Sequence, residues 1–171
     1  QCSNIKILNT PRHPRMQVLF LGYDRTQTRL IDAMIAAGCE VHHSRSPVGV
    51  VQYDLIISFG YRHIVGREVI RGINCPILNL HISYLPFNRG THPNFWAYFD
   101  NTPHGVTIHI MDAGVDTGPI LFQKYVDFMN GESTFLESHT TLVRAVEDLF
   151  LDHIETILQK KWEAKPQEGQ G

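Results

Sequence analysis

Asn79 and His81 stand two residues apart at the end of an apolar run, in the segment ILNLHIS. In a β-strand, residues i and i+2 point to the same face, so the amide and the imidazole would project together. An amide N–H can donate to a carbonyl oxygen, and a histidine can stabilise an oxyanion or carry a proton near neutral pH. Two polar residues at a strand end also fit a simple hydrogen bond to a loop, so the pair alone does not decide between these interpretations.

A second polar segment, MDAGVDTGP, carries Asp112 and Asp116 between two apolar runs. Gly114 and Gly118 bracket Asp116, and glycine permits backbone conformations that other residues resist. The loop could therefore turn tightly and aim a carboxylate, although Asp and Gly are also ordinary turn residues. By itself the segment predicts a plain turn as readily as a site.

The elements that would position these residues follow an alternating order of apolar runs and helical patterns. We expect strands at 16–24, from 41 onward, and at 53–60, 75–83, 105–112 and 119–128, and helices at 26–38, 64–72, 92–101 and from 134. Strands that alternate with helices predict an α/β fold, a Rossmann-like, mainly parallel sheet flanked by helices. Such sheets bind ligands beyond the carboxyl ends of their strands, which is where Asn79 and His81 would lie.

The last helical segment has the clearest pattern. Its apolar residues mark one face of a single long amphipathic helix that runs to Leu158, and Thr134 with Glu137 predicts a capping box at its start. We expect an N-terminal extension at 1–15, one catalytic domain at 16–162, and a polar tail or linker at 163–171.

Four aromatic residues gather in the segment after the glycine-containing loop: Phe95, Trp96, Tyr98 and Phe99. Aromatic residues at helical spacing usually face a core, and that is the expectation here. The alternative is a platform on which a nucleotide base stacks.

Composition narrows the class of protein. The chain has 171 residues and a net charge of -2 with both signs interspersed, which disfavours a nucleic-acid partner. The three cysteines, Cys2, Cys39 and Cys75, form no CxxC pair, so the sequence indicates neither a disulfide framework nor a zinc finger and favours the reducing cytoplasm. The ten histidines show no HxxxH or HExxH pattern, and we predict no metal site. No apolar run is long enough to cross a bilayer, and no signal peptide is apparent.

Taken in order, the motifs are N-x-H, an L-P and R-G loop, G-V-T-x-H-x-x-D, and D-x-G-x-I. This order resembles the formyltransferase family that uses 10-formyltetrahydrofolate as formyl donor. The resemblance runs from about Met16 to Phe150 and is densest between Ile77 and Gln123. It implies the formyltransferase fold and an enzyme that transfers a formyl group to an amine.

The resemblance also assigns residues. It implies that the catalytic residues are Asn79, His81 and Asp116. The segment SFGYRHIV resembles the stretch that borders the folate pterin, which implies a donor site formed by Gly60, Tyr61, Arg62 and Ile64, with Asp112, Ala113 and Gly114 on the opposite wall. Asn79 and His81 would stabilise the tetrahedral oxyanion, and Asp116 would orient His81 and assist proton transfer.

Several acceptors fit the resemblance. We expect a nucleotide-linked amino sugar used for surface polysaccharide, because NLHISYLPFNRGTHPNFW and YRHIV look most like sugar-nucleotide N-formyltransferases. Methionyl-tRNA formyltransferases carry a second, tRNA-holding domain, and glycinamide ribonucleotide formyltransferases have a Gly-rich phosphate loop where this chain has GYDRTQTR. Sugar formyltransferases often have a dimer segment, so a homodimer is one expectation.

Two further alternatives remain. A formyltetrahydrofolate hydrolase would use the same three residues with water as acceptor. A non-catalytic folate-binding module would keep the pterin segment without needing the three residues. We expect no membrane partner.

Overall fold

A six-stranded sheet forms the centre of the protein in the computed structural model, which describes residues 15–128 and 134–169. Its strands are β1 (Gln17–Gly22), β2 (Glu40–Ser44), β3 (Leu55–Phe59), β4 (Ile77–His81), β5 (Gly105–Ile110) and β6 (Ile120–Tyr125). The spatial order is β2-β1-β3-β4-β5-β6, with parallel pairing up to β4 and antiparallel pairing for β5 and β6. The predicted α/β fold with a mainly parallel sheet is therefore confirmed.

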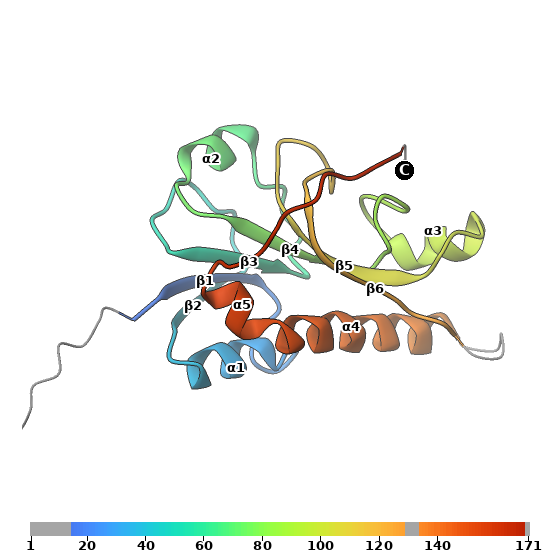
Figure 1. The fold of residues 1–171 in the computed structure, drawn as a ribbon, viewed down its shortest axis with the longest axis horizontal. Helices are drawn as coiled ribbons and strands as arrows, with labels where there is room; N and C mark the ends of the chain where they lie inside the picture. The colour runs from blue at the N-terminus through green and yellow to red at the C-terminus, as the bar shows by residue number, and fades with distance from the viewer. Residues whose placement is uncertain (1–14, 129–133, 170–171) are drawn as a thin grey trace, which may run out of the picture.

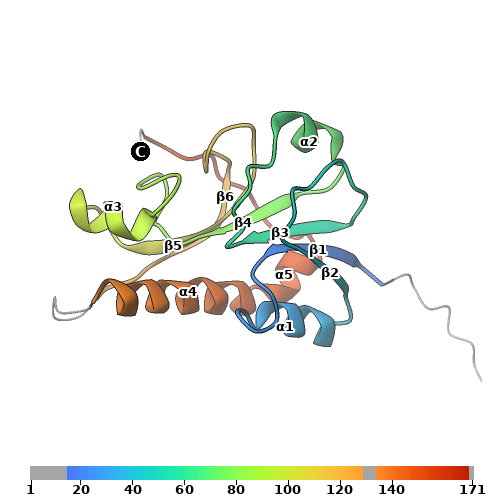
Figure 2. The ribbon, with the colours of Figure 1, turned by 180° about the vertical axis from the view of Figure 1, so that it is seen from behind.

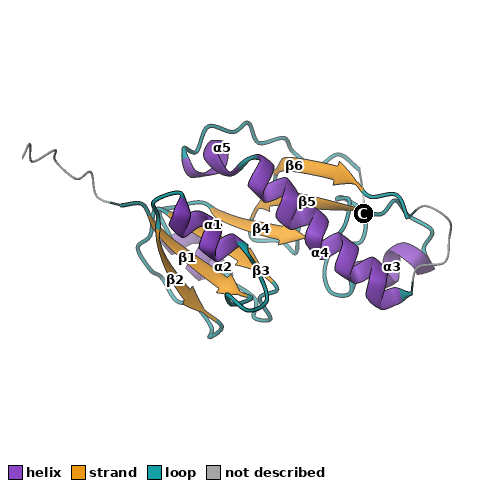
Figure 3. Cartoon of the chain, turned by 90° about the horizontal axis from the view of Figure 1, so that it is seen from below, coloured by secondary structure: helices purple, strands orange, loops and turns teal. Residues whose placement is uncertain are grey.

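Helices lie on both faces of this sheet (Figures 1 and 2). They are α1 (Leu30–Ala36), α2 (Arg67–Gly72), α3 (Pro93–Phe99), α4 (Phe135–Asp152) and α5 (Ile154–Leu158). Helices α1, α4 and α5 cover one face, and α2 lies on the other. Seen from below, α4 runs obliquely under the sheet towards α3 (Figure 3).

Two apolar clusters account for the unbroken apolar sequence of β1. Val18 and Phe20 belong to the cluster shared with α1 and α4, whereas Leu19 and Leu21 belong to the cluster on the α2 face. Alternate residues of a strand point to opposite faces, so a strand covered on both faces must be apolar at every position. This packing fixes the central strands whose ends carry the predicted site.

A buried carboxylate joins α4 to the turn before α1. Glu147 accepts hydrogen bonds from Thr28 Oγ1 at 2.5 Å and from Arg29 Nε at 3.0 Å. Its side chain is 8% exposed, and a charge so far from water is stable only when it is paired and hydrogen-bonded. The contact therefore holds α4 in register against α1.

Two sequence predictions are wrong. The single long helix is interrupted at His153, whose ring stacks on Phe122 with centroids 3.9 Å apart and an interplanar angle of 8°.

The aromatic residues of α3 do not face the core: Phe95, Trp96, Tyr98 and Phe99 are 47%, 42%, 45% and 71% exposed. Helix α3 instead buries Pro93, Asn94 and Ala97, so its aromatic stripe faces outward.

The segment after α5 returns across the protein (Figure 1). Ile120 and Lys165 exchange both main-chain hydrogen bonds, at 2.7 and 2.8 Å, in an isolated antiparallel bridge at the start of β6. This bridge brings the residues that follow it towards the loop between β5 and β6. Within the described chain, no helix has the length and apolarity that a membrane crossing requires.

The predicted capping box at the start of α4 is confirmed, and it generates a test of stability. Thr134 Oγ1 accepts from Glu137 N at 3.2 Å, and Thr134 N donates to Glu137 Oε2 at 2.9 Å. We expect Thr134→Ala to lower the free energy of unfolding by about 1 kcal/mol, measured by urea denaturation.

The matched control is Thr141→Ala, at an exposed interior position of the same helix. Because alanine has a higher helix propensity than threonine, this change should leave stability unchanged or raise it by a few tenths of a kcal/mol. Equal losses in the two variants would contradict the role of the cap.

Candidate active site

The carboxyl end of β4 carries two polar residues on one side of the sheet. Asn79 lies opposite Ser58 of β3 and His109 of β5, and His81 lies opposite Thr107 of β5. The residues between and beside them, Leu78 and Leu80, point into the apolar core on the α4 side. The i, i+2 spacing therefore directs the amide and the imidazole together, away from that core.

Asp116 reaches this pair from the loop between β5 and β6. Its carboxylate accepts from Asn79 Nδ2 at 3.0 Å and from Gly90 N at 2.9 Å, and Oδ2 lies 3.7 Å from His81 Nδ1. Its backbone is left-handed, with φ of 50°. A Cβ at Gly118 would lie 1.8 Å from the Ile110 carbonyl oxygen, so glycine is required there for the loop to fold back tightly. The structure thus brings together the three predicted catalytic residues.

Sequence reasoning missed a fourth residue, His109, which is 1% exposed. Its Nδ1 lies 3.0 Å from the Ile110 carbonyl, which can only accept, so Nδ1 carries a proton. Its Nε2 lies 3.2 Å from Asn79 Nδ2 and 3.4 Å from Asp116 Oδ1. With Nδ1 protonated, Nε2 can accept from Asn79 Nδ2. The alternation in GVTIHI places His109 on the polar face of its strand, but its contacts with Asn79 and Asp116 depend on the register between β4 and β5.

The pKa values of Asp116 and His81, the two titratable groups at the centre of the site, are both lowered. Burial raises the pKa of Asp116, but the hydrogen bond with His109, the nearby His81 and the Gly90 N–H outweigh it and bring the pKa to about 2 from an ordinary 3.8. Burial lowers the pKa of His81 despite the opposing effect of the Asp116 charge. At neutral pH the site therefore holds an ionised carboxylate beside a neutral imidazole.

The hydrogen bonds of His81 fix where its proton sits. Nε2 lies 3.1 Å from the main-chain carbonyl of Asn88, which can only accept. Nε2 therefore carries the proton in the neutral ring, and Nδ1 presents a lone pair on the side of Asp116. A proton arriving at Nδ1 would create a charged pair with the carboxylate. The arrangement is that of a general base supported by a buried anion.

The residues assigned to the donor by resemblance lie beyond β3, the strand next to β4. Gly60, Tyr61, Arg62 and Ile64 follow its carboxyl end, and Tyr61 is fixed there by its hydroxyl, which donates to Ser46 O at 2.8 Å. Arg67 Nε donates to Ala113 O at 3.3 Å, which ties this segment to the loop of Asp112, Ala113 and Gly114. Ile64 is 91% exposed. An exposed aliphatic side chain offers apolar surface that a bound ligand would cover.

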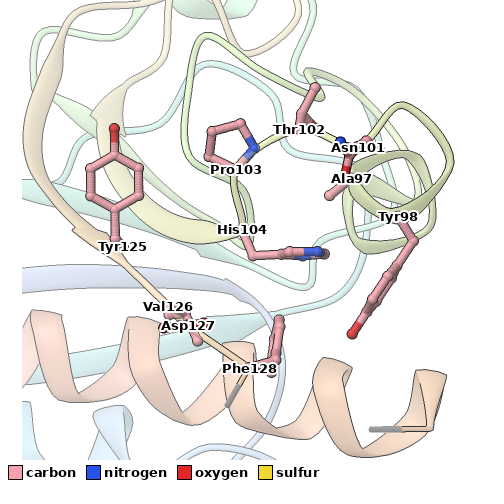
Figure 4. A pocket seen from close by; sticks show the side chains of 10 residues that line it. All are labelled: Ala97, Tyr98, Asn101, Thr102, Pro103, His104, Tyr125, Val126, Asp127 and Phe128. Atoms are coloured by element: carbon pink, nitrogen blue, oxygen red, sulfur yellow. The ribbon is translucent and has the colours of Figure 1, made fainter. Parts of the chain in front are cut away.

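A cavity of about 430 Å³ lies elsewhere, between α3 and the end of β6 (Figure 4). Tyr98, His104 and Phe128 line it, and His104 Nδ1 is buried without a hydrogen-bond partner among the described residues. None of the predicted catalytic or donor residues lines this cavity. In the described ranges, no three His, Cys, Asp or Glu side chains are grouped as a metal ion would need; that no metal is used stays a prediction.

The lowered pKa of Asp116 generates a pH-dependent test of stability. A carboxyl whose pKa is lower in the folded state stabilises it above the unfolded pKa, and this contribution is lost as pH falls from about 4 to about 2. We expect Asp116→Asn to be less stable than the unmodified protein at pH 7, by about 2 kcal/mol, with the difference shrinking over that pH window. Urea denaturation at a series of pH values measures it.

Asp152→Asn, at the exposed end of α4, removes the same charge outside the site and serves as control. The free energies of unfolding of Asp116→Asn and the unmodified protein could instead differ by the same amount from pH 7 to pH 2. That result would show that the charge of Asp116 does not contribute to stability.

Comparison with known proteins adds independent information. A family model described as formyl transferase matches residues 40–154. The dTDP-4-amino-4,6-dideoxyglucose formyltransferase of Mycobacterium tuberculosis is 31% identical over 116 residues, which cover 68% of this chain and 48% of that protein. The methionyl-tRNA formyltransferase of Clostridium novyi is 37% identical over 105 residues, which cover 61% of this chain and 34% of that protein. The chain thus spans about half the length, or less, of these curated relatives.

A solved structure is similar over most of its length. The formyltransferase PseJ from Anoxybacillus kamchatkensis superposes with a TM-score of 0.84 at 33% identity, covering 91% of this chain and 84% of that one. The PseJ structure contains UDP-4,6-dideoxy-4-formamido-L-AltNAc and tetrahydrofolate. The family match extends over well more than half of the sequence and includes Asn79, His81 and Asp116. The chain belongs to the formyl transferase family.

Proposed function

We propose that this protein transfers the formyl group of 10-formyltetrahydrofolate to the amine of a nucleotide-linked amino sugar. The observation that carries the proposal is the convergence of Asn79 and His81 on the single carboxylate of Asp116. A neutral imidazole beside an ionised carboxylate can take the proton of an attacking amine, and an amide N–H can stabilise the oxyanion of acyl transfer. The donor, when bound, supplies an activated formyl carbon.

The proton of the attacking amine needs an acceptor. In the proposed mechanism, the amine nitrogen bonds to the formyl carbon, His81 Nδ1 takes the amine proton, and Asp116 stabilises the resulting imidazolium across the 3.7 Å gap. The imidazolium then returns this proton to the donor nitrogen that carried the formyl group, as the bond between that nitrogen and the formyl carbon breaks and tetrahydrofolate leaves. The hydrogen bond from Nε2 to the Asn88 carbonyl keeps the ring in the correct orientation. Because His81 is only 7% exposed, water does not screen the new charge pair effectively.

The oxygen of the formyl group needs a hydrogen-bond donor as it becomes negative. Asn79 Nδ2 has two N–H groups, of which one is held by Asp116 and the other points to His109 Nε2 at 3.2 Å. The hydrogen bond to His109 is weaker than the one to the charged Asp116 carboxylate. The N–H that faces His109 is therefore the one that would turn to the formyl oxygen. Asp116 fixes the orientation of the amide, because an ionised carboxylate can only accept.

In this proposal the donor is bordered by two segments of the chain, its two walls. One wall is the segment with Gly60, Tyr61, Arg62 and Ile64, and the other is the loop of Asp112, Ala113 and Gly114. Asp112 Oδ1 accepts from Gly114 N at 2.9 Å and from Thr117 Oγ1 at 2.6 Å, which makes that wall rigid. These contacts support the assignment of the two segments to 10-formyltetrahydrofolate.

The similarity to PseJ, at 33% identity and with a formamido sugar nucleotide bound in that protein, supports the sugar acceptor. The relative of Mycobacterium tuberculosis is named for an amino sugar nucleotide as well. Methionyl-tRNA is the second candidate acceptor, because the relative of Clostridium novyi has 37% identity over a shorter match. The net charge of -2 favours the sugar nucleotide over a tRNA.

The wider setting follows from this acceptor. We propose that the enzyme acts in the cytoplasm, in the synthesis of surface polysaccharide, and needs no metal and no membrane partner. A homodimer is part of this proposal.

The role of His81 gives the first test of the proposed function. We expect His81→Ala to lower kcat at least about 10²-fold while the Kd for a folate analogue changes less than about threefold, because the imidazole acts on the proton rather than on binding. Steady-state assays of 10-formyltetrahydrofolate consumption measure kcat, and fluorescence titration measures the Kd for the folate analogue. His42→Ala, exposed on edge strand β2, is the control. Unchanged turnover in His81→Ala would refute this role.

The exposed Ile64 gives a separate test of the donor site. Covering an aliphatic side chain with ligand is worth about 1–2 kcal/mol, so Ile64→Ser should weaken folate binding by roughly five- to thirty-fold. Leu136→Ser changes another exposed apolar residue, in the first turn of α4, and should leave the Kd unchanged. Equal Kd values for both variants and the unmodified protein would place the pterin elsewhere.

A further inference from the structure

Gln167, in the segment predicted to be a polar tail or linker, joins two loops of the site. Its Nε2 donates to the main-chain carbonyls of Asp116 and Gly118, each at 2.8 Å. Its Oε1 accepts from Arg89 Nε at 3.0 Å and from Arg89 Nη2 at 2.7 Å. A side-chain amide has two N–H donors and two acceptor lone pairs, so the whole capacity of this amide is used within the site.

The backbone nearby holds Gln167 in place. Lys165, two residues earlier, exchanges both main-chain hydrogen bonds with Ile120. Ile120 is the first residue of β6, which follows the Asp116 loop. The bridge therefore delivers the Gln167 side chain to that loop.

The contacts of Gln167 close a ring. From Gln167 the ring passes through the Arg89 guanidinium to the next residue, Gly90. Gly90 N donates to the Asp116 carboxylate at 2.9 Å, and the Asp116 main-chain carbonyl accepts from Gln167 Nε2, which completes the ring. The loop that carries the carboxylate is thus tied to the loop that follows β4, whose Asn88 carbonyl accepts from His81.

We propose that Gln167 is a positioning residue for formyl transfer, which holds the carboxylate of Asp116 against Asn79 and His81 by tying its main chain to the Arg89 loop. Each loop contains a residue with a left-handed backbone, Asp116 with φ of 50° and Asn88 with φ of 56°. Asp and Asn adopt this conformation more readily than other non-glycine residues, and the contacts of Gln167 add to the local geometry that keeps the two loops together. We call the four hydrogen bonds of Gln167 to Arg89, Asp116 and Gly118 the brace. Its effect on kinetics rests on the proposed function, whereas the brace itself does not.

Two substitutions separate the halves of the brace. Gln167→Glu keeps an acceptor for Arg89 but loses both donors to the Asp116 and Gly118 carbonyls. Gln167→Ala loses all four hydrogen bonds. The matched controls are Gln159→Glu and Gln159→Ala, because Gln159 is exposed at the end of α5 and makes no side-chain hydrogen bond within the described chain.

The first readout does not depend on activity. Amide hydrogen exchange of Gly90 N–H, followed by NMR, reports the hydrogen bond to Asp116 directly. We expect exchange at least about tenfold faster in both Gln167 variants, with core amides of β1 and β3 unchanged, because only the local opening equilibrium is altered. Exchange at Gly90 equal to that of the Gln159 controls would overturn the brace.

The second readout is kinetic and uses a double-mutant cycle. We expect Gln167→Glu to lower kcat by about tenfold or more with the KM for 10-formyltetrahydrofolate within about threefold, because a misplaced carboxylate affects the reaction and not donor binding. In an Asp116→Asn background the same change should have little further effect on kcat. An equal loss in both backgrounds would show that Gln167 does not act through Asp116.

The outcomes keep the two proposals apart. If the unmodified protein consumes no donor with any amine, the proposed function fails, and the Gly90 exchange still decides the brace. If the unmodified protein is active and the Gln167 variants behave as the Gln159 controls do, the positioning role fails and the proposed function stands.

Discussion

The buried negative charge of Asp116 is the constraint on which the rest of the site depends. Its side chain is 14% exposed, so the charge must be met by donors from the protein. Asn79 and Gly90 supply hydrogen bonds, and His81 and His109 lie close enough to respond to the charge. Asn79 and His81 come from β4, His109 from β5 and Gly90 from the loop after β4, so the arrangement requires these two strands and both loops to be in place.

The same charge gives the site its proposed chemistry. A neutral imidazole beside a carboxylate in a site largely shielded from water can take a proton at a moderate cost, since the charged pair that forms is poorly screened. The amide of Asn79, oriented by the carboxylate, offers an N–H to a developing oxyanion. The two segments proposed to hold the donor follow β3 and β5, the strands on either side of β4. Because β5 runs antiparallel to β4, the loop after β5 starts at the opposite end of β4 and folds back to bring Asp116 to Asn79.

The sequence predicted the parts of the site that depend on local pattern. The two-residue spacing of Asn79 and His81 and the glycines around Asp116 are local signals, and the structure brings these residues together. His109 was missed because its contact depends on the antiparallel register of β4 and β5, which periodicity does not reveal. Gln167 was missed because its segment has no apolar pattern and is fixed by main-chain pairing with Ile120. The exposed aromatics of α3 differ from prediction because the small residues of that helix, rather than the large ones, face the protein.

The most direct test of the central claim follows the conversion of 10-formyltetrahydrofolate to tetrahydrofolate with and without a panel of nucleotide-linked amino sugars. We expect consumption of the donor only when one of these amino sugars is present, with one equivalent of formamido sugar formed for each donor consumed. Equal consumption without any amine would contradict formyl transfer to an amino sugar and identify water as the acceptor.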